Sequence, residues 1–280
     1  MPLRPEQLDK GATRPLNRTS TSLMPASNPK DRVTVISIRE VPPHLSKEAF
    51  ETNVRALADS LMALPVCKKN FLRYDLIFQT PSLDANLRAL GFLESRPHVL
   101  SIAECESSDH WAEILADPEF ARIVTEGEKF GFCSSARAFF ADVATKIDSS
   151  AAAVDPTCLF AVFKAPTRLP QQEYFQKLDE LVDRALALPI CKKVFSKYSM
   201  HLPSNVDMNL QNIDSMLRAL DLPAPEPGAV FITEVSSSGD LVELLAHPDI
   251  QKFAMEAMHE IEIHVNGVAS LGNVEAKVKS

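Results

Sequence analysis

The run Leu64-Pro65-Val66-Cys67-Lys68-Lys69 returns 124 residues later as Leu188-Pro189-Ile190-Cys191-Lys192-Lys193. At the same offset, Tyr74 is matched by Tyr198. Self-similarity that keeps one spacing over separated positions indicates repeated structural units. The sequence therefore predicts a duplicated domain.

The offset grows to 130 farther along the chain, where Leu87-Arg88-Ala89-Leu90 is matched by Leu217-Arg218-Ala219-Leu220. An insertion between Pro203 and Leu217 accounts for the change. The stretch 149–155, with its alanine run, separates the copies and indicates a linker. The predicted organisation is a flexible arm at 1–31, a first domain at 32–148, a linker at 149–156 and a second domain at 157–276.

Both copies show one order of strands and helices. Short β-branched or aromatic runs predict strands, and apolar residues at helical spacing predict helices. Pro65 and Pro189 are expected to end the first helix of each copy, since proline disfavours helical geometry in the residue before it. The predicted strands are 33–39, 70–79, 98–105 and 135–143 in the first copy, and 157–163, 194–202, 229–235 and 265–274 in the second.

This β-α-β-β-α-β order is that of the ferredoxin-like unit, whose antiparallel sheet carries both helices on one face. The other face is bare and needs a partner, which a second copy in the same chain can supply sheet against sheet. We therefore predict an α+β fold in which two ferredoxin-like repeats form an intrachain pseudo-dimeric α/β barrel. Whether two such chains also associate as a homodimer is left open.

Composition excludes several classes of function. The chain has 29 Lys and Arg against 37 Asp and Glu, a net charge of −8, which argues against nucleic acid or an anionic membrane as the main partner. No apolar run approaches the roughly 20 residues that span a bilayer. The five cysteines form no C-x-x-C pair, which indicates reduced thiols in a cytoplasmic protein rather than a disulfide framework or metal site.

A family resemblance follows from two stretches. Asp117-Pro118-Glu119-Phe120, after a strand that ends Glu104-Cys105-Glu106-Ser107, resembles the dimeric α/β-barrel superfamily. The stretch 39–50 is similar to the opening of its EthD-like branch, common in fungi and related to the stress-responsive A/B barrels. In place of the aromatic residue and histidine of the EthD-like pattern, the first helix has Thr52-Asn53-Val54-Arg55, so an activity that rests on that histidine is not carried over.

The resemblance implies a protein that acts on or binds a small hydrophobic metabolite. Superfamily relatives include cofactor-free polyketide cyclases, quinone-forming monooxygenases, haem enzymes and proteins without a known reaction. We expect a cofactor-independent cyclase, lyase or isomerase of secondary metabolism that acts on a hydrophobic carbonyl or polyketide-like compound. The alternatives are a non-catalytic binding or stress-response barrel and a haem-dependent enzyme.

Two histidines are candidate acid–base residues, since imidazole titrates near neutral pH. His201 replaces the Ile77 of the first copy, and a buried imidazole needs a polar partner. His98 begins a predicted strand. The resemblance to a plant polyketide cyclase puts its catalytic histidine one residue away, at Val99, which faces the other side of the strand.

Strand alternation suggests companions for these histidines. Lys197, Ser199 and His201 share one face of their strand, while Tyr198 lies on the other and reaches His201 only through a bulge. The divergence between copies favours a working pocket in the second one, beside the longer connection 206–216. The predicted catalytic residues are His201, Tyr198, His98 and Tyr74, and the predicted substrate-binding residues are Lys197, Ser199, Arg73 and Trp111.

Overall fold

Eight strands close into an antiparallel barrel in the computed structural model, which describes residues 32–149, 157–166, 168–204, 228–235 and 237–278. Their order around the barrel is β1-β3-β2-β8-β5-β7-β6-β4. The strands are β1 (Val33–Glu40), β2 (Phe71–Thr80), β3 (His98–Cys105), β4 (Ala136–Asp148), β5 (Thr157–Lys164), β6 (Phe195–Pro203), β7 (Gly228–Val235) and β8 (Gly267–Val278). The predicted α+β class is confirmed.

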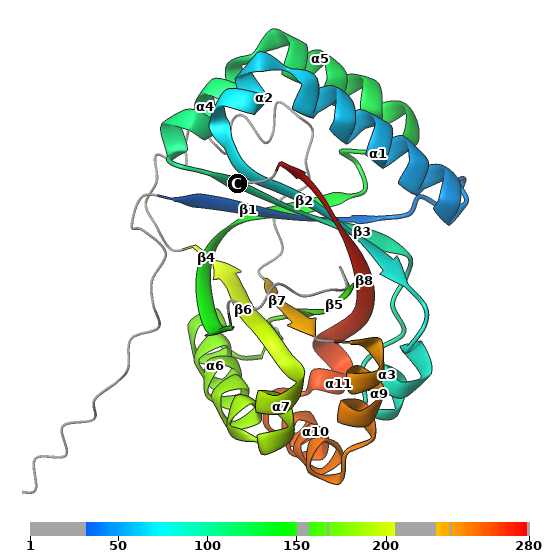
Figure 1. Cartoon of the computed structure of the whole chain (residues 1–280), viewed down its shortest axis with the longest axis vertical. Helices are drawn as coiled ribbons and strands as arrows, with labels where there is room; N and C mark the ends of the chain where they lie inside the picture. The colour runs from blue at the N-terminus through cyan, green and yellow to red at the C-terminus, as the bar shows by residue number, and fades with distance from the viewer. Residues whose placement is uncertain (1–31, 150–156, 167, 205–227, 236, 279–280) are drawn as a thin grey trace, which may run out of the picture.

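Helices cover two opposite sides of the barrel (Figure 1). One layer consists of α1 (Lys47–Ala63), α2 (Pro65–Asn70), α4 (Ser108–Ala116), α5 (Pro118–Gly127) and the short η1 (Glu128–Phe130). The other consists of α6 (Gln171–Ala187), α7 (Pro189–Val194), α9 (Ser238–Ala246), α10 (Pro248–Ile261) and α11 (Ile263–Asn266). Helix α3 (Asp84–Ala89) follows β2 in the chain but lies beside α9 in the second layer (Figure 1).

Side-chain caps and prolines fix where these helices begin. The Ser46 hydroxyl accepts a hydrogen bond from the backbone N–H of Ala49, and the Asp117 carboxylate accepts two at the start of α5. Pro65 and Pro189 follow the ends of α1 and α6 but also begin α2 and α7, because the first helical position needs no N–H donor. The repeated proline motif therefore forms a short second helix in each half, and neither of these helices was predicted.

The barrel closes through hydrogen bonds between strands rather than by sheet packed against sheet. The strands β4 and β8 run past their predicted ends at 143 and 274, and their added length pairs with β6 and β2. The predicted start of β8 at 265 is also wrong, because α11 occupies 263–266. Gly272 allows the close crossing inside the barrel, since a Cβ there would lie 2.4 Å from the Ile77 side chain.

Apolar side chains form three cores. One fills the barrel interior and includes Ile36, Leu100 and Phe160, while the other two lie between the barrel wall and each helix layer.

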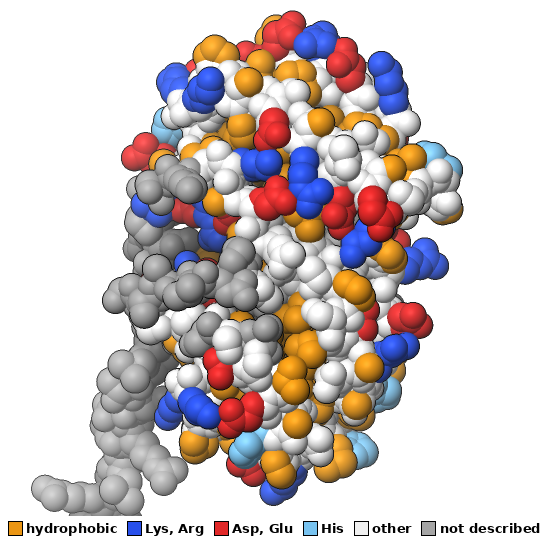
Figure 2. Space-filling view, turned by 45° about the vertical axis from the view of Figure 1, so that its right-hand side comes forward, with side chains coloured by type: hydrophobic (Ala, Val, Ile, Leu, Met, Phe, Trp, Pro, Cys, Tyr) orange, Lys and Arg blue, Asp and Glu red, His pale blue; other side chains and the backbone are white. Residues whose placement is uncertain are grey.

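On the face shown in Figure 2, acidic and basic side chains are mixed over the upper half. Ion pairs also connect α1 to β8, with 2.7 Å between Arg55 and Glu275.

Several predictions concern residues outside the described ranges. The arm at 1–31, most of the linker at 149–156 and the connection 206–216 all fall there, so the domain boundaries stay predictions. None of the helices in the described part of the chain is long and apolar enough to cross a membrane.

Candidate functional site

Each half of the molecule has a cavity between the barrel wall and its helix layer. The first cleft, under α1, α4 and α5, has a volume of 80 Å³ and is lined by Ser37, Arg39 and Ser101. The second cleft, under α6, α9 and α10, has a volume of 170 Å³. At the positions that match those three polar residues by offset, it is lined by Ala161, Phe163 and Phe231.

Arg39 is the central polar group of the first cleft. Its Nε donates to the Phe132 carbonyl oxygen at 3.0 Å, and its Nη1 donates to the hydroxyls of Ser37 and Ser101 at 2.5 and 3.0 Å. The guanidinium also lies over the Phe132 ring, 4.0 Å from its centroid. Neighbouring β1 and β3 set this geometry, because Ser37 and Ser101 are directly paired across the ladder.

All of these partners are neutral, although Arg39 is only 8% exposed. No carboxylate of the described residues forms an ion pair with it, and burial lowers its pKa. Arginine still keeps its proton in proteins, so the cleft holds a buried positive charge. A buried charge without a counter-ion costs several kcal/mol, and an anionic or strongly polarised oxygen would offset that cost.

Two predicted site residues lie in the same cleft. Burial raises the pKa of the Tyr74 phenol, while the positive charge of Arg39 and the Ser101 hydroxyl oppose the shift. The Trp111 indole N–H is buried and has no hydrogen-bond partner in the described part of the chain. Both rings pack on Phe71, with centroids 5.5 and 5.4 Å away. The cleft thus combines hydrogen-bond donors with aromatic walls.

The second cleft keeps the aromatic lining and loses the charge. Phe163 and Phe231 pack together with ring centroids 4.8 Å apart, and burial raises the pKa of the Tyr198 phenol beyond its ordinary range. Leu87 and Phe92, from the segment around α3, complete the wall of this cavity. The second cleft is therefore an apolar space to which both halves contribute.

His201 lies inside the barrel, away from both clefts. Its Nε2 is 3.1 Å from the Ser199 hydroxyl, and its Nδ1 has no hydrogen-bond partner among the described residues. Burial lowers its pKa to about 3, with smaller contributions from the positive charges of Arg73 and Lys197. His201 lines neither cleft nor either of two further cavities at one end of the barrel.

The expected pair of His201 and Tyr198 is not formed. The register of β6 against β7 is regular from Lys197 to His201, so no bulge turns the two side chains to one face. Tyr198 instead belongs to the core under the second helix layer. The alternative prediction, that Ser199 is the neighbour of His201, agrees with the structure.

The charged residues predicted with His201 form ion pairs on β2 and between β6 and β7. Arg73 and Asp75 are 2.5 Å apart on β2, and Lys197 lies 3.7 Å from Glu234 on β7. Of these four residues only Asp75 is buried, and Arg73 offsets the cost of desolvating its carboxylate. Lys197 and Glu234 are partly exposed, so their ion pair contributes little to stability. These residues therefore have structural partners in addition to their predicted role in binding.

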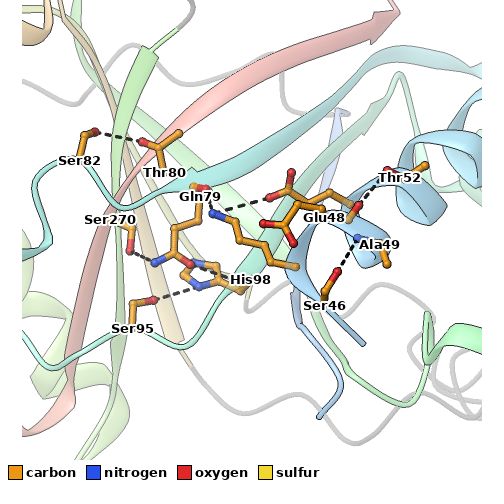
Figure 3. Close-up of polar contacts among 12 residues, drawn as sticks. Ser46, Glu48, Ala49, Thr52, Gln79, Thr80, Ser82, Ser95, His98 and Ser270 are labelled. Carbon is orange, nitrogen blue, oxygen red and sulfur yellow. Dashed lines mark hydrogen bonds and ion pairs between the residues drawn. The ribbon is translucent and has the colours of Figure 1, made fainter. Parts of the chain in front are cut away.

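His98 occupies a third place, where β3 begins. Its Nδ1 is 2.8 Å from the Arg96 carbonyl oxygen and 3.0 Å from the Ser95 hydroxyl (Figure 3). The ring stands edge-on to Phe160, and burial lowers the pKa of the imidazole. Of the predicted catalytic residues, Tyr74 therefore lies in the first cleft and Tyr198 in the second. His98 and His201 lie at two separate positions inside the barrel.

Arg39, Ser37 and Ser101 were not among the predicted site residues. The signal was present, since the repeat offsets match Arg39 with Phe163 and Ser101 with Phe231. A polar residue at a position that is apolar in the other copy indicates a specialised environment. Among the described residues, no group of three or more His, Cys, Asp or Glu side chains gathers as a metal site.

Two solved structures share the fold. An anthrone oxidase-like protein is 12% identical, with a TM-score of 0.59 over 90% of this chain and 96% of that one. A Fusobacterium nucleatum protein, provisionally described as a monooxygenase, is 7% identical, with a TM-score of 0.52 over 89% of this chain and 95% of that one. No protein-family model and no curated protein matches the sequence. The likenesses support the dimeric α/β-barrel fold and leave the EthD-like branch a prediction.

Proposed function

We propose that the first cleft binds the carbonyl end of a small aromatic or polyketide-like compound and that the protein is a cofactor-independent cyclase, lyase or isomerase. The observation that carries this proposal is the buried charge of Arg39 among neutral partners in an aromatic cavity. Fixed donors aimed at a developing oxyanion are the largest single contribution in many enzymes. The fold is compatible with an enzyme-like site for small molecules, and the name of the anthrone oxidase-like neighbour refers to an aromatic ketone.

The chemistry that suits this cleft is attack of an enol carbon on a carbonyl carbon within one substrate. Arg39 and the Trp111 N–H donate to the carbonyl oxygen, which gains the electron pair of the C=O π bond as the new C–C bond forms. The raised pKa of Tyr74 keeps its phenol protonated, so it can give its proton to that oxygen. The enol O–H proton passes to solvent, from which Tyr74 regains its own.

The test is Arg39→Met, a variant of similar length without charge. Turnover of aromatic ketones and linear polyketones should fall by about a hundredfold or more. The melting temperature should stay constant or rise, because the variant removes a buried charge. Phe163→Met at the matched position of the second cleft is the control and should keep full turnover. Equal turnover in Arg39→Met and the wild type would contradict the proposal.

His201 and Ser199 are a second candidate pair because they form a direct contact inside the barrel. His201→Ile copies the residue of the first half and removes the imidazole that contacts Ser199. If this variant keeps its fold but loses turnover, the reaction takes place inside the barrel and the working pocket belongs to the second copy. Retained ligand on native mass spectra without turnover of any panel compound would favour the non-catalytic binding protein.

Further proposals concern the evolutionary origin of the protein, its location in the cell and its partners. The same pairing order in both halves, β4-β1-β3-β2 and β8-β5-β7-β6, supports descent from one duplicated ferredoxin-like domain. An EthD-like origin, a cytoplasmic location, a hydrophobic metabolite as partner and a homodimer remain parts of the proposal. Light scattering of the purified protein tests the homodimer directly.

A further inference from the structure

The second cleft is the larger of the two helix–sheet cavities, and smaller side chains line it. Ala185 stands at the position that matches Leu61 of the first cleft, and Ala254 at the position that matches Val124. Both exchanges add space, and the volume is 170 Å³ against 80 Å³ in the first half. An apolar cavity of about 150 Å³ lined by Leu, Ile and Phe stays dry and binds benzene, so this space suits a compound with a single ring.

The walls of the second cleft are apolar and partly aromatic. Phe163 packs against Phe231 and Phe92, with ring centroids 4.8 and 6.1 Å apart. None of the described residues that line the cavity is charged. A charged group would lose its hydration there without gaining a counter-ion, so the occupant that fits is uncharged.

Two residues with hydroxyl groups interrupt this apolar lining. Thr233 is paired directly with Tyr198 across the ladder of β6 and β7, at a position where the first cleft has Ala103. The Tyr198 hydroxyl has no hydrogen bond with any described residue, although the residue is only 8% exposed. That hydroxyl keeps some accessible surface, whereas the Tyr174 hydroxyl is fully enclosed. Tyr198 therefore offers its O–H to the cavity that it lines.

The matching tyrosine of the first half shows what Tyr198 lacks. Tyr74 has the Ser101 hydroxyl beside it. The position that matches Ser101 holds Phe231, whose ring centroid is 5.9 Å from that of Tyr198. Burial raises the pKa of the Tyr198 phenol, which therefore stays protonated and is a donor without an acceptor. A ligand that brings an acceptor oxygen would satisfy this donor.

We propose that the second cleft is a binding site for a small, uncharged ring compound that carries one acceptor oxygen, such as an aryl ketone. The Tyr198 O–H donates to the ketone oxygen, and the ring of the ligand packs against Phe163 and Phe231 in edge-on or offset contacts. The ligand is bound without being converted. This site is separate from the first cleft and independent of the reaction proposed there.

Isothermal titration calorimetry with acetophenone and ethylbenzene tests the role of the phenol. Ethylbenzene has a similar size but no acceptor oxygen. Tyr198→Phe should weaken acetophenone binding about fivefold and leave ethylbenzene binding unchanged, a difference that a merely structural role of the phenol would not produce. Equal effects on the two ligands, or no binding of acetophenone to the wild type, would overturn the proposal.

Cavity-filling variants locate the bound ligand. Ala185→Leu copies Leu61 of the first half and should weaken acetophenone binding about tenfold or more, while the melting temperature stays constant or rises. Ala187→Leu, at an exposed position of the same helix, is the matched control and should bind as the wild type does.

A variant of the first cleft separates the two sites. Arg39→Met should keep the binding of acetophenone to the second cleft, and benzoate should not bind measurably to this variant. Loss of acetophenone binding in Arg39→Met together with normal binding in Ala185→Leu would place the ligand in the first cleft and overturn the proposal. Tighter binding of benzoate than of acetophenone to Arg39→Met would also overturn it.

Discussion

The two helix–sheet clefts occupy matching places in the fold and hold opposite chemistry. Arg39, paired with two serine hydroxyls, is replaced in the second cleft by Phe163, packed on Phe231. The backbone registers around them are alike, since Ser37 pairs with Ser101 and Ala161 with Phe231. The barrel scaffold thus tolerates a charged or an apolar cleft in one position, provided that each side chain has suitable partners on the neighbouring strand.

The largest effect is expected when a positive charge is introduced into the second cleft. Phe163→Arg places a guanidinium where Ala161 and Phe231 offer no acceptor, and it also removes a ring that is 3% exposed. The free energy of unfolding should fall by about 3–5 kcal/mol, measured by urea denaturation. The triple variant Ala161→Ser, Phe163→Arg, Phe231→Ser restores the hydroxyls and should recover part of this loss. A loss below about 1 kcal/mol in the single variant would show that partners on the strand do not decide which cleft can hold a charge.

A smaller effect, on the pH dependence of stability, is expected at His201. This residue lies inside the barrel at the position that Ile77 occupies in the first half. The folded-state pKa of His201 is about 3, below its ordinary 6.5, so its stabilisation is complete above pH 6.5 and is lost as the pH falls toward 3. From pH 6.5 to 5 the wild type should lose about 2 kcal/mol on this account, at about 1.4 kcal/mol per pH unit.

His201→Ile should reduce that loss, whereas His44→Gln, at an exposed histidine, should leave it unchanged. Urea denaturation at the two pH values measures the difference. The buried His98 also has a lowered pKa, so some pH dependence of the same sign will persist in His201→Ile. An equal slope in His201→Ile and the wild type would mean that His201 does not stay neutral in the fold.

The smallest expected difference concerns the paired tyrosines. Tyr74→Phe removes a phenol oxygen that interacts electrostatically with Arg39 and Ser101, and should lower the free energy of unfolding by about 1 kcal/mol. Tyr198 has no hydrogen bond among the contacts of the described residues, so Tyr198→Phe should change stability by less than about 0.5 kcal/mol. Equal losses in the two variants would show that the hydroxyls have equivalent environments after all.

Much of the fold could be predicted from local pattern. The strand at 98–105 was predicted with its observed bounds, and alternation correctly placed Lys197, Ser199 and His201 on one face. The candidate site was predicted only in part. Tyr74 and Trp111 lie in the first cleft. Arg39 was missed although its match with Phe163 distinguishes the two copies, whereas its contacts with Ser37 and Ser101 could not be predicted before the strands are paired.

The sequence by itself determined the repeated order of strands and helices, since periodicity and proline positions act over a few residues. Only the tertiary structure decided which side chains meet. Ser37 and Ser101 lie 64 residues apart in the chain, and their contact depends on the register of β1 against β3. The closure of the barrel by the long ends of β4 and β8 depends in the same way on pairing between the halves. Such contacts arise from the packing of distant segments, and a local pattern carries no information on their register.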